Sequence, residues 1–173
     1  MMSEKQNSLN QAQLIDQAAY LEDELAALKT VISAVPYDEK PPGLPSIKEM
    51  LMEIRRAQES YYAPLIKGIF SDAQPEFNDL QDIQKSHNDT HASVVDPLEV
   101  IEETMVSRAK LMDILRKIPL NDWDRIGTVN GQELTMRDVL SEMIKFERGK
   151  FKEIAERVLV IDASRSSIKP PKT

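Results

Sequence analysis

His87 and His91, the only two histidines of the 173-residue chain, lie four residues apart in "SHNDTH". On a helix this spacing puts both imidazoles on one face, where a metal ion could bind both. A zinc or nickel site needs at least three ligands, and the residues from Asn88 to Thr90 are poor helix formers. We therefore interpret the pair as two exposed histidines in a loop rather than as a metal site.

The net charge of the chain limits the kinds of molecule that it is expected to bind. The formal net charge is −7, which argues against nucleic acid and anionic membranes, since both are bound by clustered Lys and Arg. The nearest approach to a basic patch is the set Lys145, Arg148, Lys150 and Lys152, and Glu142, Glu147 and Glu153 are interleaved with it. We interpret this stretch as a solvated helix face with some inward residues.

Composition also bears on location and chemistry. The chain has no cysteine, which excludes disulfides, thiolate nucleophiles and Cys-ligated metals. No apolar run approaches the ~20 residues of a transmembrane helix. The polar N-terminus lacks the apolar stretch of a secretory signal. We expect a cytoplasmic protein without a membrane partner.

Apolar residues recur three and four positions apart in four stretches, which predicts four amphipathic helices. The stretches cover residues 9–34, 46–69, 96–118 and 135–160. Ser46 and Glu49 predict a capping box at the start of the second helix. Asp96, followed by a proline, predicts the start of the third. Pro64 lies inside the second stretch and predicts a kink or an early end.

Two further segments connect these helices. Between residues 72 and 95 the periodicity fails, so we expect a long connection with at most a short helix over 77–85. Asn130-Gly131 predicts a tight turn, in a small hairpin, before the fourth helix, which Thr135 and Asp138 would cap. Four helices and one long crossover predict an all-α four-helix bundle, with a three-helix domain and a helical arm as the alternative.

The chain length suits one domain. We assign residues 8–160 to the bundle, residues 1–7 to a disordered N-terminus and residues 161–173 to a flexible C-terminal tail. Within the bundle, Glu147 falls on the apolar face of the fourth helix together with Phe151. An inward carboxylate needs a partner, which Arg108, Tyr61 or Tyr62 could supply. Burial would raise the pKa of Glu147, as in a general acid or base, but we favour structural pairing.

Three segments together resemble the DinB/YfiT-like family. "LNDWDRIGTVNGQELTMRDVLSEMIKFERGKFKEI", residues 120–154, is similar to the family's closing segment. In such segments an aromatic loop and a turn containing Gly precede Leu-Thr and a helix. "PSIKEMLMEI", residues 45–54, is similar to the start of the family's second helix, and "SRAKLMDIL", residues 107–115, to its third. The resemblance covers most of the chain.

The resemblance implies an up-down-down-up bundle with a long connection between helices 2 and 3, often as a homodimer. It also implies a divalent metal such as Zn or Ni, held by one histidine of helix 2 and two of helix 4. Members with that triad include thiol-dependent transferases and isomerases. Here the three positions hold Glu53, Phe146 and Lys150. Because Phe has no donor atom and an ammonium no lone pair, we expect a degenerate site without a metal.

These residues suggest a replacement for the metal. Glu53 and Lys150 would form an ion pair if the bundle brings them together, with Phe146 filling the vacated volume; otherwise both charged side chains point to solvent. We expect a ligand-binding or interaction protein rather than an enzyme. Its cleft candidates are Glu53, Tyr61, Arg108, Phe146, Glu147 and Lys150. The alternative is a metal-dependent hydrolase or thiol transferase with a displaced site of Glu53, Glu147 and a histidine of the connection.

Overall fold

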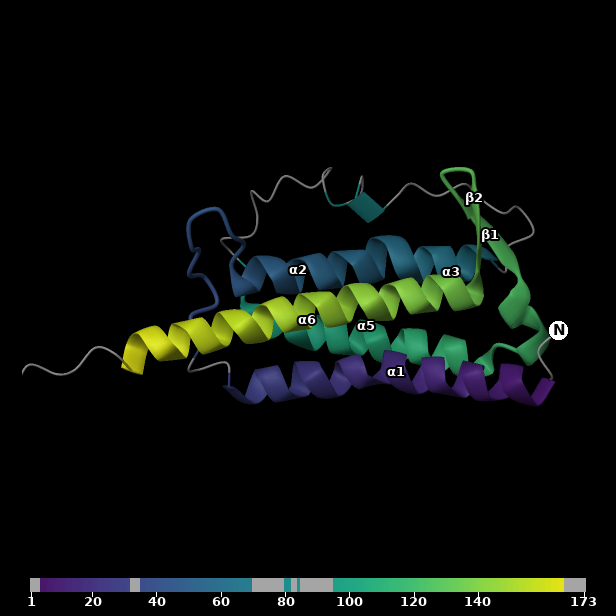
Figure 1. The fold of residues 1–173 in the computed structure, drawn as a ribbon, viewed down its shortest axis with the longest axis horizontal. Helices are drawn as coiled ribbons and strands as arrows, with labels where there is room; N and C mark the ends of the chain where they lie inside the picture. The colour runs from purple at the N-terminus through teal and green to yellow at the C-terminus, as the bar shows by residue number, and fades with distance from the viewer. Residues whose placement is uncertain (1–3, 32–34, 70–79, 82–83, 85–94, 167–173) are drawn as a thin grey trace, which may run out of the picture.

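The computed structural model describes residues 4–31, 35–69, 80, 81, 84 and 95–166. Four helical rods form an elongated bundle with a two-stranded hairpin at one end (Figure 1). The elements are α1 (Glu4–Val31), α2 (Ile47–Ala57), η2 (Gln58–Tyr62), α3 (Ala63–Ile69), α5 (Pro97–Lys117), η3 (Leu120–Asp124), β1 (Ile126–Val129), β2 (Gln132–Thr135) and α6 (Met136–Ser166). The predicted all-α four-helix bundle is confirmed. His87 and His91 lie outside the described residues.

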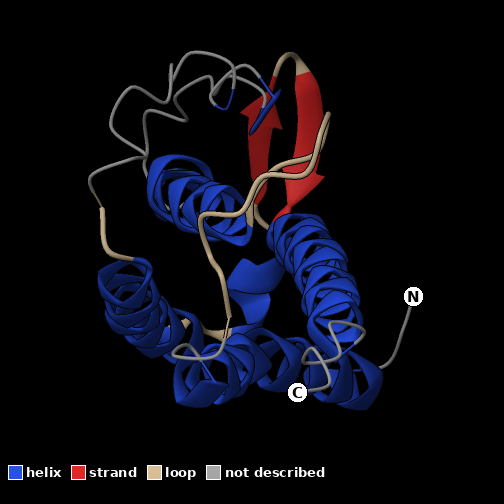
Figure 2. Cartoon of the chain, turned by 90° about the vertical axis from the view of Figure 1, so that its left-hand side faces the viewer, coloured by secondary structure: helices blue, strands red, loops and turns tan. Residues whose placement is uncertain are grey.

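The rods follow the expected up-down-down-up order. α2 and α5 begin at the same end of the bundle, whereas α1 and α6 begin at the end that carries the hairpin (Figure 1). α5 contacts α1 and α2, and α6 contacts the same two helices. Seen along the bundle, the rods surround a shared interior and the hairpin stands to one side (Figure 2). α3 ends where the hairpin lies, and α5 begins at the other end of the bundle (Figure 1).

The helix starts predicted at Ser46 and Asp96 are confirmed. The Ser46 hydroxyl accepts the Glu49 backbone N–H at 3.1 Å, and the Glu49 carboxylate accepts the Ser46 backbone N–H at 2.7 Å, which completes the capping box. Asp96 accepts the Leu98 backbone N–H at 2.9 Å at the start of α5. These caps satisfy N–H groups that have no partner within the helix.

The helix ends reach further than the sequence predicts. α1 begins at Glu4, inside the segment expected to be disordered, and α6 continues to Ser166, inside the expected flexible tail. Nucleation is the costly step of helix formation. Adding one residue to an existing helix fixes the backbone of only that residue and forms one new hydrogen bond, so a helix can extend without a further cap. At the C-terminal end Ile161 is also buried in the core.

Pro64 does not end the second rod. The five residues of η2 form a π-helical turn, in which the Ala63 N–H donates to the carbonyl of Gln58. A proline ring clashes with the carbonyl four residues earlier in a regular helix, and the wider turn relieves that clash. The predicted kink is therefore a π turn, and the helix continues as α3.

The hairpin joins α5 to α6. Its two strands are antiparallel, and Val129 pairs with Gln132 across the turn. Asn130 and Gly131 both have positive φ, 48° and 75°, as the expected two-residue turn requires. A Cβ on Gly127 would lie 2.7 Å from the Ile69 side chain, so the absence of a side chain lets β1 approach α3.

The core consists of two apolar clusters. One lies at the hairpin end and includes Leu65, Trp123 and Met136. The other includes Leu25 and Ile47 at the opposite end. Between them each rod contributes one polar group, namely the Ala18 carbonyl and the side chains of Gln58, Arg108 and Glu147. None of the described helices is long and apolar enough to cross a membrane.

Candidate functional site

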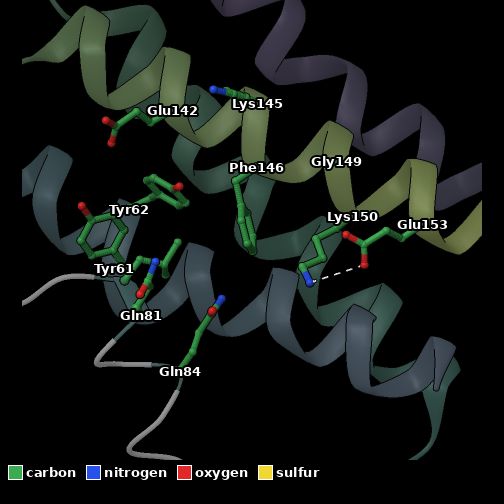
Figure 3. Close-up of a pocket in the computed structure, with 11 residues that line it drawn as sticks. Tyr61, Tyr62, Gln81, Gln84, Glu142, Lys145, Phe146, Gly149, Lys150 and Glu153 are labelled. Carbon is green, nitrogen blue, oxygen red and sulfur yellow. Dashed lines mark ion pairs between the residues drawn. The ribbon is translucent and has the colours of Figure 1, made fainter. Parts of the chain in front are cut away.

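A cleft with a volume of about 520 Å³ lies beside α6 (Figure 3). Two tyrosines of η2 form one wall, and residues of α6 form the opposite wall. Residues 80, 81 and 84 close a third side. The lining residues are Tyr61, Tyr62, Leu80, Gln81, Gln84, Glu142, Lys145, Phe146, Gly149, Lys150 and Glu153. Its volume is in the range of small-molecule sites.

Three aromatic rings and Leu80 form the apolar part of the cleft. Tyr61 and Tyr62 contact each other edge to face, with ring centroids 4.8 Å apart. The ring of Phe146 lies 6.3 Å from that of Tyr62 and projects from α6 into the cleft (Figure 3). Both tyrosines are buried and Phe146 is half-buried, so the Phe146 ring presents most of the exposed aromatic surface.

Glu53 and Lys150 form the ion pair that the sequence suggested. The Lys150 ammonium lies 2.6 Å from the Glu53 carboxylate and 3.7 Å from that of Glu153. The side chains of Lys150 and Glu53 are 20% and 29% exposed, so the alternative in which both point to solvent is wrong. Water still reaches the pair, and partly exposed pairs of this kind contribute about 0–1 kcal/mol.

The three positions of the implied metal site do come together, but their side chains do not fit a metal. Phe146 precedes Lys150 by one helical turn and has no donor atom. The Glu53 carboxylate is bound to an ammonium. Within the described part of the chain, no group of three or more His, Asp or Glu side chains is arranged to hold a metal ion.

A second ion pair connects α5 and α6 in the middle of the core. Arg108 donates from Nη2 to Glu147, from Nε to the Gln58 side chain at 2.7 Å and from Nη1 to the Ala18 carbonyl at 3.1 Å. Gln58 in turn donates to the Thr104 carbonyl at 3.2 Å. One guanidinium thus bonds to the other three rods, and every nitrogen of its fork has an acceptor. We call this set the buried network.

Burial governs the acidity of Glu147. The residue is 4% exposed, and this desolvation raises its pKa from 4.5 to about 7. The positive charge of Arg108 and its hydrogen bond oppose that rise, and the negative charge of Glu24 adds to it. The expected raised pKa and the pairing with Arg108 are both confirmed.

Arg108 and Glu147 do not line the cleft, contrary to our expectation. Arg108 is fully buried, and the fork of its guanidinium is used within the buried network. Helical periodicity places both residues inward correctly, but it does not distinguish the core from a cleft. Of the other expected residues, Tyr61, Phe146 and Lys150 line the cleft, and Glu53 reaches it through Lys150.

The sequence reasoning missed several lining residues. Glu142, Lys145 and Glu153 belong to the stretch interpreted as a solvated face, and they line the cleft as well. Gly149 is visible in the sequence as a glycine in the interior of a helix, where it costs about 1 kcal/mol relative to Ala. Gln84 gave no signal, since its role depends on tertiary contacts.

A separate apolar groove with a volume of about 790 Å³ lies between α1 and α6. Tyr20, Val31 and Leu159 line it and are large apolar side chains exposed to solvent. Its charged members are Glu24 on α1 and Arg148 and Lys152 on α6. Partial burial raises the pKa of Glu24, and the Arg148 charge opposes that rise.

Comparisons with known proteins support the fold. The sequence matches no protein-family model and no curated protein. Among solved structures the chain is similar to YfiT from Bacillus subtilis, described as "a probable metal-dependent hydrolase with an unusual four-helix bundle topology". The TM-score is 0.67 at 11% sequence identity, with 91% of this chain and 90% of that chain covered. The chain therefore has a four-helix bundle fold like that of YfiT.

Proposed function

We propose that the protein binds a small molecule in the cleft beside Phe146 and Lys150, without a metal ion and without catalysing a reaction. The observation that carries the proposal is an open cleft of about 520 Å³, one of whose lining residues, Lys150, is paired with Glu53. In the terms of the family resemblance, a carboxylate and an ammonium have replaced a metal, and Phe146 has replaced one of its ligands. The lack of cysteine and the net charge of −7 are consistent with a cytoplasmic location.

The geometry suits binding better than catalysis. Its aromatic wall supplies apolar contact area, and its amides and charged groups supply polar contacts at the edge. A general base or nucleophile would need an orienting partner that leaves it free to react. The Lys150 ammonium is instead occupied by two carboxylates.

The rival is a metal-dependent hydrolase or thiol transferase, and of these two the description of YfiT favours the hydrolase. Its displaced site would need Glu53 and Glu147 to share a metal ion. In this structure the Glu53 carboxylate bonds to Lys150 and that of Glu147 to Arg108, so each already has a different cationic partner.

Two measurements test the proposal against this rival. We expect fluorinated fragments to bind the purified full chain in ¹⁹F NMR. The same fragments should not bind the Phe146→Trp variant, because the larger indole ring fills the cleft. We expect elemental analysis of the same sample to find far less than one equivalent of Zn or Ni. About one equivalent per chain, lost in Glu53→Ala, would establish the rival; fragments that bind Phe146→Trp unchanged would remove the cleft from the proposal.

We further propose that two copies of the chain pair through the groove between α1 and α6. A two-fold axis through the groove would let Glu24 of one copy face Arg148 or Lys152 of the other, so the groove would be complementary to itself. Exposed side chains at its edge, Tyr20 and Leu159, would be buried in such a pair.

Light scattering after size-exclusion chromatography tests the pairing. We expect the wild-type chain to elute with twice its 19.7 kDa mass and Leu159→Glu to elute as a monomer. Val106→Glu, on an exposed apolar residue of α5 outside the groove, is the matched control and should leave the dimer intact. A monomeric wild type would exclude the dimer, and loss of the dimer in both variants would exclude this groove.

A further inference from the structure

Gly149 has no packing reason to be a glycine. It lies in the interior of α6, where glycine is less favourable than any residue except proline. A Cβ placed on it would meet no atom of the described residues within 4 Å. Gly127, in contrast, is required by the approach of Ile69. The space that Gly149 leaves belongs to the cleft, beside Phe146 and Lys150 (Figure 3).

The charges around the cleft compensate one another. Its lining contains two carboxylates and two ammonium groups, those of Glu142, Glu153, Lys145 and Lys150. Lys150 is paired with carboxylates on both α2 and α6. Lys145 is exposed and lies on the other side of Phe146 from Lys150 (Figure 3). The four charges of the lining therefore sum to zero, and a charged ligand would lose its hydration on entering the cleft without meeting a net opposite charge, so the cleft favours an uncharged ligand.

One hydrogen-bond donor remains unused beside the aromatic wall. Nε2 of Gln84 is shielded from solvent and has no acceptor among the described residues. The amide of Gln84 is directed toward the space below Phe146 (Figure 3). Because a shielded donor without a partner is unfavourable, an acceptor on a bound molecule would stabilise this arrangement.

We propose that the cleft binds a flat, uncharged molecule with a carbonyl-type acceptor, that Gln84 donates to this acceptor, and that Gly149 gives the molecule room against Phe146. The proposal rests on the proposed function, since it names the class of ligand and two of its contact residues. A flat molecule suits the slot between a ring and a helix backbone without a side chain.

Three probes of one shape test the class of ligand. Benzamide, benzoate and benzamidine differ in charge, and each is titrated into the ¹⁵N-labelled full chain. We expect benzamide to shift the backbone resonances of Phe146 and Gly149, with a Kd at least about 10-fold lower than those of the two ions. Tighter binding of either ion in the cleft, or no shift with any probe, overturns the proposed ligand class.

Variants of Gly149 and Gln84 test the contact residues. Gly149→Leu should raise the Kd for benzamide at least about 10-fold, and Gln84→Leu should do the same by removing the donor. Gly149→Ala should weaken binding less while raising the Tm by about 2–4 °C, because alanine favours the helix. An unchanged Kd in either leucine variant overturns the role of that residue.

Ala155→Leu is the matched control, because it adds similar bulk to the same helix in the groove with α1. It should leave benzamide binding unchanged. The circular dichroism of each variant reports whether it has folded. Fragments that bind the cleft while all three probes fail would overturn the ligand class and leave the proposed function standing. If neither fragments nor probes bind, both fail.

Discussion

Among the described residues, α6 forms ion pairs with two of the other rods of the bundle, α5 and α2, and these two pairs have opposite surroundings. Glu147 pairs with Arg108 in the middle of the core, where the side chains are 5% and 0% exposed. Lys150 pairs with Glu53 at the edge of the cleft, where the side chains are 20% and 29% exposed. A carboxylate and a cationic side chain therefore pair at both places, but only the Lys150–Glu53 pair is accessible to water.

This difference assigns different roles to the two pairs. The buried charges have lost their hydration, so each must remain paired, and the pair fixes how the four rods align more than it adds net stability. Arg108 bonds to groups on α1, η2 and α6, so a shift of any one rod would leave a charged donor without an acceptor. The pair at the cleft is screened by water and can rearrange around a ligand at little cost.

Removing one member of the buried network should have the largest effect. Arg108→Met leaves the Glu147 carboxyl and the Gln58 side-chain oxygen buried without a donor. We expect the free energy of unfolding to fall by about 3–5 kcal/mol. Urea unfolding followed by circular dichroism at pH 7 measures it.

Arg108→Met with Glu147→Leu is the control, because it removes both charges together. We expect the double variant to be more stable than Arg108→Met alone. A single variant that loses less than about 1 kcal/mol, or a double variant that loses the sum of the two singles, would mean that the buried pair behaves like an exposed one.

Stability should also depend on pH through Glu147. Because its pKa is raised to about 7 in the folded chain, the folded state binds more protons than the unfolded state between about pH 4.5 and 7. Its contribution to stability is therefore complete below pH 4.5 and is lost as pH rises through 7, by about 3 kcal/mol in total. Unfolding curves of wild type and Glu147→Gln between pH 5 and 8 measure this: the wild type should lose stability relative to Glu147→Gln as the pH rises, and a difference that stays constant with pH would mean that Glu147 does not titrate in this range.

Much of the fold follows from local sequence signals. Ser46, Asp96 and Asn130-Gly131 each satisfy a backbone requirement within a few residues, so the helix starts and the turn could be predicted. The partner of Glu147 was within reach because the helical period places the carboxylate inward. Where a helix ends was not predictable without such a cap, as α1 and α6 demonstrate.

The site was less accessible to sequence reasoning. Gln58 lies in a π turn, where the period of the helix changes, so no regular pattern marks it as inward. Arg108 was expected in the cleft because periodicity gives the direction of a side chain and not the depth of the space it enters. Glu53 and Lys150 were paired through the family resemblance, because nothing local to either residue connects α2 with α6.

The cleft pair should show the smallest effect, and its size decides whether the comparison holds. We expect a double-mutant cycle of Glu53→Gln and Lys150→Gln to give a coupling energy of about 0.2–1 kcal/mol, because water screens both groups. That coupling should weaken further in about 0.5 M NaCl, whereas the cycle through Arg108 and Glu147 should not respond to salt. A coupling above about 2 kcal/mol that salt leaves unchanged would indicate a dry pair. In that case Glu53 and Lys150 would hold α2 and α6 as firmly as the buried network does, and the cleft would have to bind its ligand without rearranging them.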